Sequence, residues 1–290
     1  MRLVIIHQLR EQKQSLQRGA NCGGIRSQSS LVNQLRQIVR YREAIRTMVA
    51  RDLKVRYSNS VLGVLWSLFN PLLITVVYTL VFTFLFPNAM EKFPVFFLAG
   101  LLPWSFFNWA TLSCTTSIIA NGHLISRVYF PRDILPLSMV LSNLVNFLLA
   151  LIPLLGVALA FRLPLRLPLL MLPVLILIQC LLSLGIGLFL AALNVHFRDT
   201  QQVVEVLLQA MFFLTPIIYP LEFIQDSQAQ LMMRVLNPLT SLVTSYQDII
   251  YAGRWPEPTF LAITTIEALV LLAFGYWFFH KNSPYFVEQL

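Results

Sequence analysis

The sequence predicts an all-α integral membrane protein with six transmembrane helices. Of its 290 residues, 57% are apolar and only 12% are charged, whereas a soluble domain carries about 25% charged residues. The mean hydropathy is +0.70, and six apolar runs approach the length needed to cross about 30 Å of hydrocarbon. A chain in lipid must satisfy its backbone polar groups internally, so each run is expected to be helical. This composition excludes a disordered chain and an ordinary soluble enzyme.

The six apolar runs differ in length and regularity. They are Val61–Phe86, Pro94–Ile119, Ile134–Phe161, Leu167–Val195, Val203–Tyr219 and Thr259–Phe279. The first is interrupted by Asn70-Pro71, and the fifth is short and ends at Pro216 and Pro220. The sixth contains Glu267, a carboxylate that is costly in lipid. A proton-relay role and a packing role facing the bundle are both open for this side chain.

The basic residues predict which side of the membrane each loop faces. With the N-terminus inside, sixteen of the 21 Lys and Arg residues lie in the cytoplasmic segments 1–60, 120–133, 196–202 and 280–290. This distribution obeys the positive-inside rule. We therefore expect both chain termini in the cytoplasm.

The N-terminal arm divides into two parts. Residues 1–34 are polar and have no helical period, which indicates an extension for which disorder is one interpretation. Residues 35–60 predict an amphipathic helix with apolar residues on one face, namely Leu35, Ile38, Val39, Ile45, Met48, Val49 and Leu53. Such a helix suits the inner membrane interface, where anionic headgroups attract basic residues, although packing on a soluble partner is also open. Membrane lipids, not nucleic acid, are the expected partner of the basic arm.

A further helix is predicted between the fifth and sixth runs. Asn237 is a good N-cap, Pro238 suits the first helical position, and Gly253 can end the helix. The intervening apolar residues repeat at helical spacing but are too few to span easily. We expect a re-entrant or surface helix. A seventh span, which would place the C-terminus outside, is the alternative.

The sequence carries no motif for chemistry of its own. The closest glycine spacing to a phosphate loop, Gly19 to Gly24, is followed by Ile25 instead of Lys. The four histidines and three cysteines are widely separated. We expect no catalytic residue, cofactor or metal on this chain.

Four motifs resemble those of the permease subunit of ABC-2 transporters that export lipid-linked polysaccharides such as O-antigen, capsule or teichoic acid. In order, they are Arg51–Tyr57 with Ser60–Trp66 and Asn70-Pro71, Asn121–Ile125 with Val128–Arg132, Asn194–Asp199, and Thr215–Tyr219 with Asn237-Pro238 beyond it. The resemblance covers the chain from about residue 35 onward and leaves residues 1–30 outside it.

The resemblance implies the rest of the assembly. Residues 61–290 would form a six-span permease domain in the bacterial cytoplasmic (inner) membrane, paired with a second copy of the chain. Two separate ABC ATPase subunits would bind ATP and Mg and drive export of the lipid-linked polysaccharide used in lipopolysaccharide biosynthesis. Two alternatives stay open: an ABC-2 permease for a drug or lipid, and a membrane-bound glycan-processing enzyme.

Three groups of residues are candidates for function. A coupling loop that docks the ATPase would comprise His123, Leu124, Ile125, Arg127, Val128, Tyr129 and Phe130; from the residues alone, a membrane-surface loop is equally possible. An interface or gate helix would use Ile45, Val49, Arg51, Lys54, Arg56 and Tyr57. Aromatic residues that could stack on sugars in a conduit are Trp66, Phe69, Tyr78, Trp104 and Phe107, although such residues are also common in membrane interfaces and cores.

Overall fold

A computed structural model describes residues 41–58, 63, 65–85, 91–125, 131–163 and 166–289. Within these ranges every regular element is helical. The contacts discussed below all lie within Ala44–Leu290, which forms one compact unit. The predicted extension 1–34 lies outside the described residues, as does the beginning of the predicted 35–60 helix.

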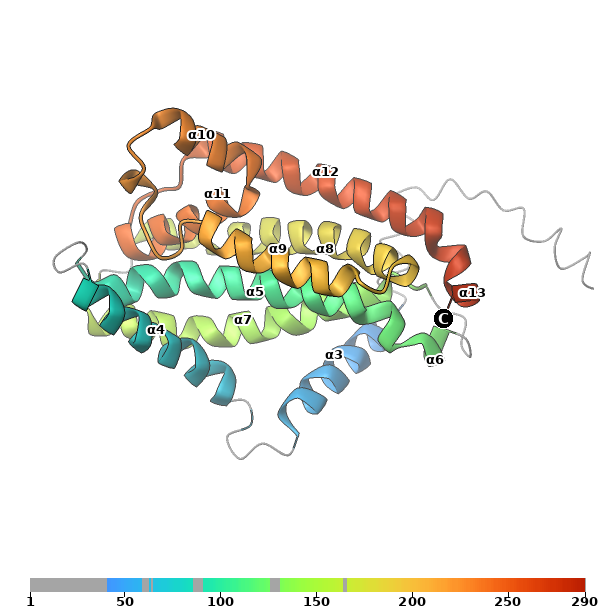
Figure 1. The fold of residues 1–290 in the computed structure, drawn as a ribbon. Coiled ribbons are helices and arrows are strands. Elements are labelled where there is room, and N and C mark those ends of the chain that lie inside the picture. Colours follow the sequence, from blue (N-terminus) through green and yellow to red (C-terminus); the bar gives the residue numbers. More distant parts are fainter. Residues whose placement is uncertain are drawn as a thin grey trace, which may run out of the picture. The chain divides into compact units, whose positions relative to one another are not determined.

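The helices follow one another in a simple order (Figure 1). In the first half they are α3 (Arg42–Tyr57), α4 (Leu65–Leu85), α5 (Phe93–Ala120), α6 (Gly122–Ile125) and α7 (Ile134–Ala160). In the second half they are η1 (Leu167–Met171), α8 (Leu172–His196), α9 (Thr200–Leu214), η2 (Leu221–Phe223), α10 (Ser227–Leu236), α11 (Pro238–Gln247), the π-helical turn η3 (Asp248–Ala252), α12 (Pro258–Asn282), η4 (Ser283–Tyr285) and α13 (Phe286–Gln289).

Four of the described helical segments are long and apolar enough to cross a membrane. They are Phe93–Ala120, Ile134–Ala160, Leu167–His196 and Pro258–Tyr285. The first and fifth predicted spans correspond to shorter apolar stretches, Phe69–Phe82 and Thr200–Leu214. An all-helical architecture is therefore confirmed for the described residues, while the count of six spans stays a prediction.

Helix α5 is the centre of the bundle. It packs against α4, α7, α8, α9 and α11, and α8 packs closely against α12. Most of α5 is buried, including Phe97, Leu98 and Ala110, because its sequence is apolar on every side. In Figure 1, α6 and α13 lie at one end of the bundle and α10 lies at the other.

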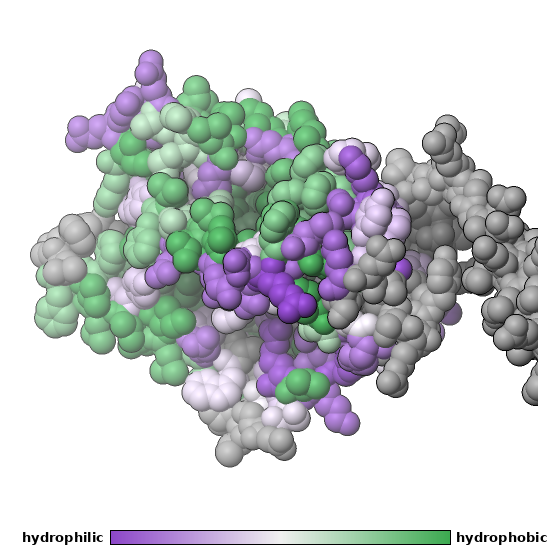
Figure 2. All heavy atoms as spheres, turned by 45° about the vertical axis from the view of Figure 1, so that its right-hand side comes forward, coloured by the Kyte–Doolittle hydropathy of each residue, from purple (hydrophilic) through white to green (hydrophobic). Residues whose placement is uncertain are grey.

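The outer surface is apolar where a soluble protein would be polar. Figure 2 shows apolar residues over a broad part of one face, with hydrophilic residues gathered at the centre and right of the view. Large exposed apolar residues follow one side of α4, namely Leu73, Val76, Val77, Leu80, Val81 and Phe84. Surfaces of this extent would cause aggregation in water. They suit contact with lipid or with other membrane helices.

Helix α11 forms where the sequence predicts it. The Asn237 side chain accepts a hydrogen bond from the Leu239 amide at 3.1 Å, and Gly253 ends the segment with φ of 63°. Ten residues rise only about 15 Å, half the thickness of the hydrocarbon core. Leu242 and Tyr246 are fully buried, because α11 packs against α5, α8 and α12. A re-entrant placement in the membrane stays a prediction.

Candidate functional site

Helix α3 is attached to the bundle by polar contacts with α5 and α7. The Arg51 guanidinium donates a hydrogen bond to Asn121 Oδ1 at 2.7 Å, just beyond the last residue of α5. Asp52, one residue further along α3, accepts a hydrogen bond from the Ser142 hydroxyl of α7. Charge-assisted bonds of this kind are stronger than neutral ones. They fix the position of α3 against both helices.

The next turn of α3 continues the same contact. Arg56 Nη1 donates to Asn143 Oδ1 at 3.1 Å, and the Tyr57 hydroxyl donates to Asn146 Oδ1 at 2.6 Å. Arg56 also lies 3.6 Å from Asp52. Positions 52 and 56 share a face of the helix because they are one turn apart. That polar face is turned toward α7.

A cavity of about 730 Å³ lies where α3 meets α4, α5 and α7. Its lining combines one guanidinium, a phenol, three carboxamides, two indoles and several apolar side chains. The lining residues are Arg56, Tyr57, Trp66, Asn70, Pro71, Ile74, Leu101, Leu102, Ser105, Phe106, Trp109, Ser113, Asn143, Asn146, Phe147 and Ala150. Its volume is in the range of small-molecule sites.

Three features of the cavity lining bear on ligand binding. Trp66 and Trp109 keep 48% and 54% of their surface exposed, so their indole faces can pack on a ring. The Asn146 Nδ2 atom is buried and has no hydrogen-bond partner, although Tyr57 occupies its Oδ1. The Arg56 guanidinium can attract an anion. The site can therefore hold an amphiphile with a ring, an acceptor group and negative charge.

The predicted interface helix supplies two residues of this cavity, Arg56 and Tyr57. Ile45 is buried, with 6% of its surface exposed, and Val49 is half-buried, as expected for the apolar face. Lys54 is exposed on the opposite side of α3.

The candidate aromatic residues do not gather at one place. Trp66 lines the cavity, and Phe69 is exposed on α4. Tyr78 stacks on Phe97 at 4.7 Å between ring centroids. Trp104 and Phe107 are buried in the core and contact each other at 6.3 Å between centroids. A role for these five residues in a conduit stays a prediction.

The predicted coupling loop is only partly described. His123 is exposed in α6, which also contains Leu124 and Ile125; Arg127, Val128, Tyr129 and Phe130 lie outside the described residues. In the next described segment, the Arg132 guanidinium donates a hydrogen bond to the Ser283 hydroxyl at 3.2 Å. This bond links the segment before α7 to η4 near the C-terminal end. Burial raises the pKa of the neighbouring Asp133, and His280 opposes that shift.

Sequence analysis did not single out Ser142, Asn143, Asn146 or Trp109 as site residues. A signal for two of them, Ser142 and Asn146, was present within the third apolar run. Ser138, Ser142 and Asn146 recur every four residues, which places them on one side of a helix. Polar side chains inside an apolar run usually find partners on neighbouring helices, and here Ser142 and Asn146 contact α3.

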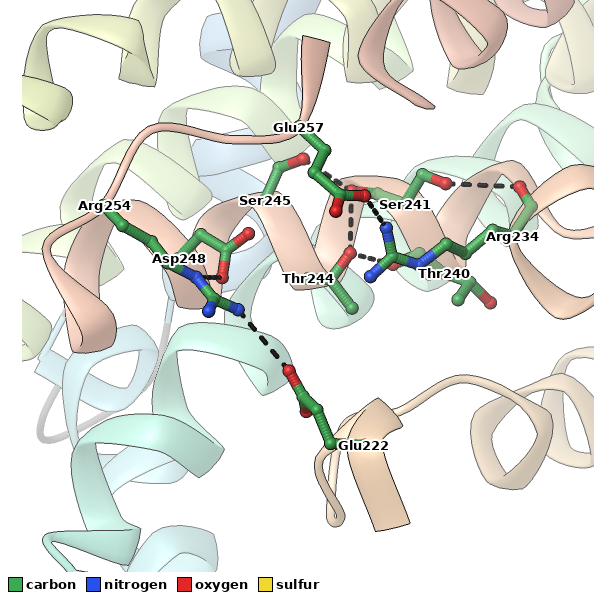
Figure 3. A network of polar contacts seen from close by, with 9 residues as sticks. All are labelled: Glu222, Arg234, Thr240, Ser241, Thr244, Ser245, Asp248, Arg254 and Glu257. Atoms are coloured by element: carbon green, nitrogen blue, oxygen red, sulfur yellow. Dashed lines mark hydrogen bonds and ion pairs between the residues drawn. The ribbon is translucent and has the colours of Figure 1, made fainter. Parts of the chain in front are cut away.

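A second polar cluster, the outer network, lies at the α10 end of the bundle (Figure 3). Arg254 donates to Asp248 Oδ1 at 2.7 Å and to Glu222 Oε1 at 3.4 Å. Arg234 forms an ion pair with Glu257. Burial raises the pKa of Asp248 despite the opposing effect of Arg254. These contacts join η2, η3, α10 and the start of α12.

The arrangement offers no place for a metal within the described part of the chain. No three His, Cys, Asp or Glu side chains lie close enough together there to hold a metal ion. The residues that line the cavity provide binding groups, and the outer network provides ion pairs.

Comparisons with known proteins find similar membrane transport proteins along most of the chain. A family model described as "ABC-2 type transporter" matches residues 43–251. The O-antigen export system permease protein RfbA of Myxococcus xanthus is 38% identical over 260 residues, which cover 90% of this chain and 100% of that protein. A Klebsiella pneumoniae protein of the same name is 32% identical, covering 83% of this chain and 92% of its own. The polysialic acid transport protein KpsM of Escherichia coli is 26% identical, covering 80% and 90%.

Proposed function

This chain belongs to the ABC-2 type transporter family, and we propose that it is the permease subunit of an exporter of lipid-linked, O-antigen-like polysaccharide. The observation that carries this proposal is the 38% identity with an O-antigen export permease over that protein's entire length. The long apolar helices and the apolar outer surface support a multi-pass membrane location.

The expected assembly contains two copies of the permease and two ABC ATPase subunits. The permease is not an enzyme in this proposal, since ATP and Mg are bound by the ATPase subunits, whose hydrolysis drives export. The surface supports association with further membrane helices. Exposed apolar residues on α9 have no partner helix on that side within the described chain; they include Val203, Val206, Leu207, Phe213 and Leu214.

The proposed orientation places α6 and α13 on the cytoplasmic side of the inner membrane. The network of Arg254 and Asp248 then lies on the outer side. This assignment follows the basic residues of the loops and the observation that α6 and α10 lie at opposite ends of the bundle (Figure 1). Six spans result if α4 and α9 also cross the membrane.

A genetic test can decide the function. Deletion of the gene should leave undelivered lipid-linked polysaccharide on the cytoplasmic side, and the wild-type gene should restore polysaccharide at the cell surface. Restoration should also require an ABC ATPase subunit able to hydrolyse ATP. Normal surface polysaccharide in the deletion strain, or export that is independent of ATP hydrolysis, would contradict the proposal.

A further inference from the structure

We propose that the cavity between α3, α4, α5 and α7 binds the head of a phosphate-linked glycolipid, with the phosphate at Arg56 and Asn146 and the first sugar against Trp66 and Trp109. The inference rests on the proposed function, because it assigns the part of the substrate that this cavity holds. Neither the family match nor the names of the relatives identifies a binding site.

The charge of the lining favours an anion. Among the described residues that line the cavity, Arg56 is the one with a charged side chain. Its nearest carboxylate, Asp52, is 3.6 Å away and also accepts a hydrogen bond from Ser142. Arg56 therefore shares Asp52 with a second donor, so this carboxylate balances its charge only in part. A phosphate oxygen is a preferred acceptor for these donors.

The second argument is the unpartnered amide of Asn146. The Tyr57 hydroxyl donates to Asn146 Oδ1 and thereby fixes which end of the carboxamide is turned away from Tyr57. The remaining Nδ2 donor is buried without a partner, which is unfavourable in an empty site. An acceptor on a bound ligand would satisfy it. Arg56 and Asn146 lie near each other in the cavity lining. Arg56 donates to Asn143 of α7, and Asn146 follows Asn143 by about one turn of the same helix.

The remaining lining suits a sugar ring carried on a lipid. Trp66 and Trp109 come from different helices, α4 and α5, and both remain about half exposed. Apolar side chains such as Ile74, Leu101 and Phe106 continue the lining. Sugar rings carry apolar C–H faces that can pack on aromatic rings, and their hydroxyls can bond with carboxamides.

Two membrane molecules share this chemistry. One is the sugar diphosphate head of a polyprenyl-linked glycan, and the other is the headgroup of an ordinary anionic phospholipid. The two indoles favour the glycan, because a phospholipid with a glycerol headgroup has no ring to pack on them.

The test measures binding to the intact permease co-purified with its ATPase in detergent. The probes are farnesyl diphosphate linked to N-acetylglucosamine, and phosphatidylglycerol as the phospholipid comparison. Binding is followed by microscale thermophoresis. Asn146→Asp is the decisive variant, because the carboxylate can still accept the Tyr57 hydrogen bond but replaces the free donor with negative charge. Its binding of the sugar probe should be weaker by about tenfold or more, since a hydrogen bond to a charged group is lost. Recovery of the ATPase equal to that of wild type checks that the variant is folded.

Trp109→Leu has a matched control in Trp277→Leu. Trp277 is 56% exposed on α12 and does not line the cavity. Loss of an indole from the site should weaken sugar-probe binding by roughly threefold to tenfold, whereas Trp277→Leu should bind as wild type does. Equal binding by wild type, Asn146→Asp and Trp109→Leu would overturn the proposal.

Two further outcomes separate this inference from the proposed function. Phosphatidylglycerol binding that matches the sugar probe, and that is equally sensitive to Asn146→Asp, would overturn the glycolipid assignment in favour of a phospholipid. A wild-type complex that exports polysaccharide in cells but does not bind the sugar probe would overturn the cavity assignment and leave the proposed function intact. Failure of export itself would instead contradict the proposed function.

Discussion

Gly275 of α12 lies directly against the backbone of Gly185 in α8. A β-carbon placed on Gly275 would lie 2.0 Å from the carbonyl oxygen of Gly185, and one placed on Gly185 would lie 2.6 Å from the Leu272 amide nitrogen. No side chain could occupy either position without separating the two helices. The pair therefore allows α8 and α12 to pack closely against each other.

Gly275→Ala should destabilise the permease because its new methyl group meets backbone instead of a flexible side chain. We expect a loss of about 1–3 kcal/mol, as for other overpacked cores, measured as a lower melting temperature in detergent. Gly156→Ala is the matched control, since nothing lies within 4 Å of its added carbon on α7. Its stability should change by less than about 1 kcal/mol. Equal melting temperatures for the two variants would contradict the close crossing.

The buried face of α3 provides a second prediction. Ile45→Asp should impair export and lower stability, because Ile45 is 6% exposed and an unpaired buried charge costs several kcal/mol. Val55→Asp on the same helix is the control, since Val55 is 69% exposed. Surface polysaccharide and the amount of membrane-inserted protein should be measured together. Similar export by both variants would show that the apolar face of α3 is not buried in the working protein.

The predictable part of the fold depends on local patterns. Long apolar runs predict the helices, and the cap formed by Asn237 and Pro238 predicts the start of α11 to the residue. The apolar positions of the arm predict that Ile45 is buried. These features depend on residues close together in the sequence, and each can be evaluated without knowing the neighbouring helix.

The cavity could not be predicted in the same way. It requires Arg56 of α3, Trp66 of α4 and Asn146 of α7 to lie around the same cavity. Their spacing along the chain does not predict that these three helices pack together there. The periodicity that marks Asn146 identifies a polar side of α7 but not its partner. Residue type alone also does not locate an aromatic side chain. Trp104 and Phe107 are candidates because aromatic rings can stack on sugars, and both are buried in the core because α5 is surrounded by other helices.

Asp248 in the outer network predicts a pH dependence of stability. Burial raises its folded pKa above the ordinary 3.8, so the folded protein holds this proton more tightly than the unfolded chain does. Stability from this group is therefore greatest below pH 3.8 and decreases as the pH rises through the raised pKa. As the pH rises from about 4 through this raised pKa, wild type should lose stability relative to Asp248→Asn. Melting temperatures of both proteins across this range test the sign, and a relative gain by wild type would show that Arg254 outweighs burial.

Asn121 would connect an ATPase docked at the predicted coupling loop to the cavity. Asn121 ends α5, accepts the hydrogen bond from Arg51 of α3, and immediately precedes α6. A displacement of the connection that follows α6 would therefore act on α3, whose Arg56 and Tyr57 line the cavity. An ATPase contact at the connection between α5 and α7 would therefore reach the proposed substrate site through α3.

Glu substitutions at Leu124 and Val128 test this contact. Both residues belong to the predicted coupling loop, and a charge that must be buried against the ATPase costs several kcal/mol, enough to weaken association by about a hundredfold or more. The double variant should reach the membrane and pair with a second copy, but should fail to retain the ATPase and should accumulate undelivered glycan. Phe223→Glu is the control, because Phe223 is 54% exposed in η2, outside the predicted spans and beside the α10 end of the bundle, away from this loop. Co-purification of the ATPase at matched expression measures the effect. Equal ATPase recovery with normal export would exclude the loop as the docking site, and energy would then have to reach α3 through another cytoplasmic contact.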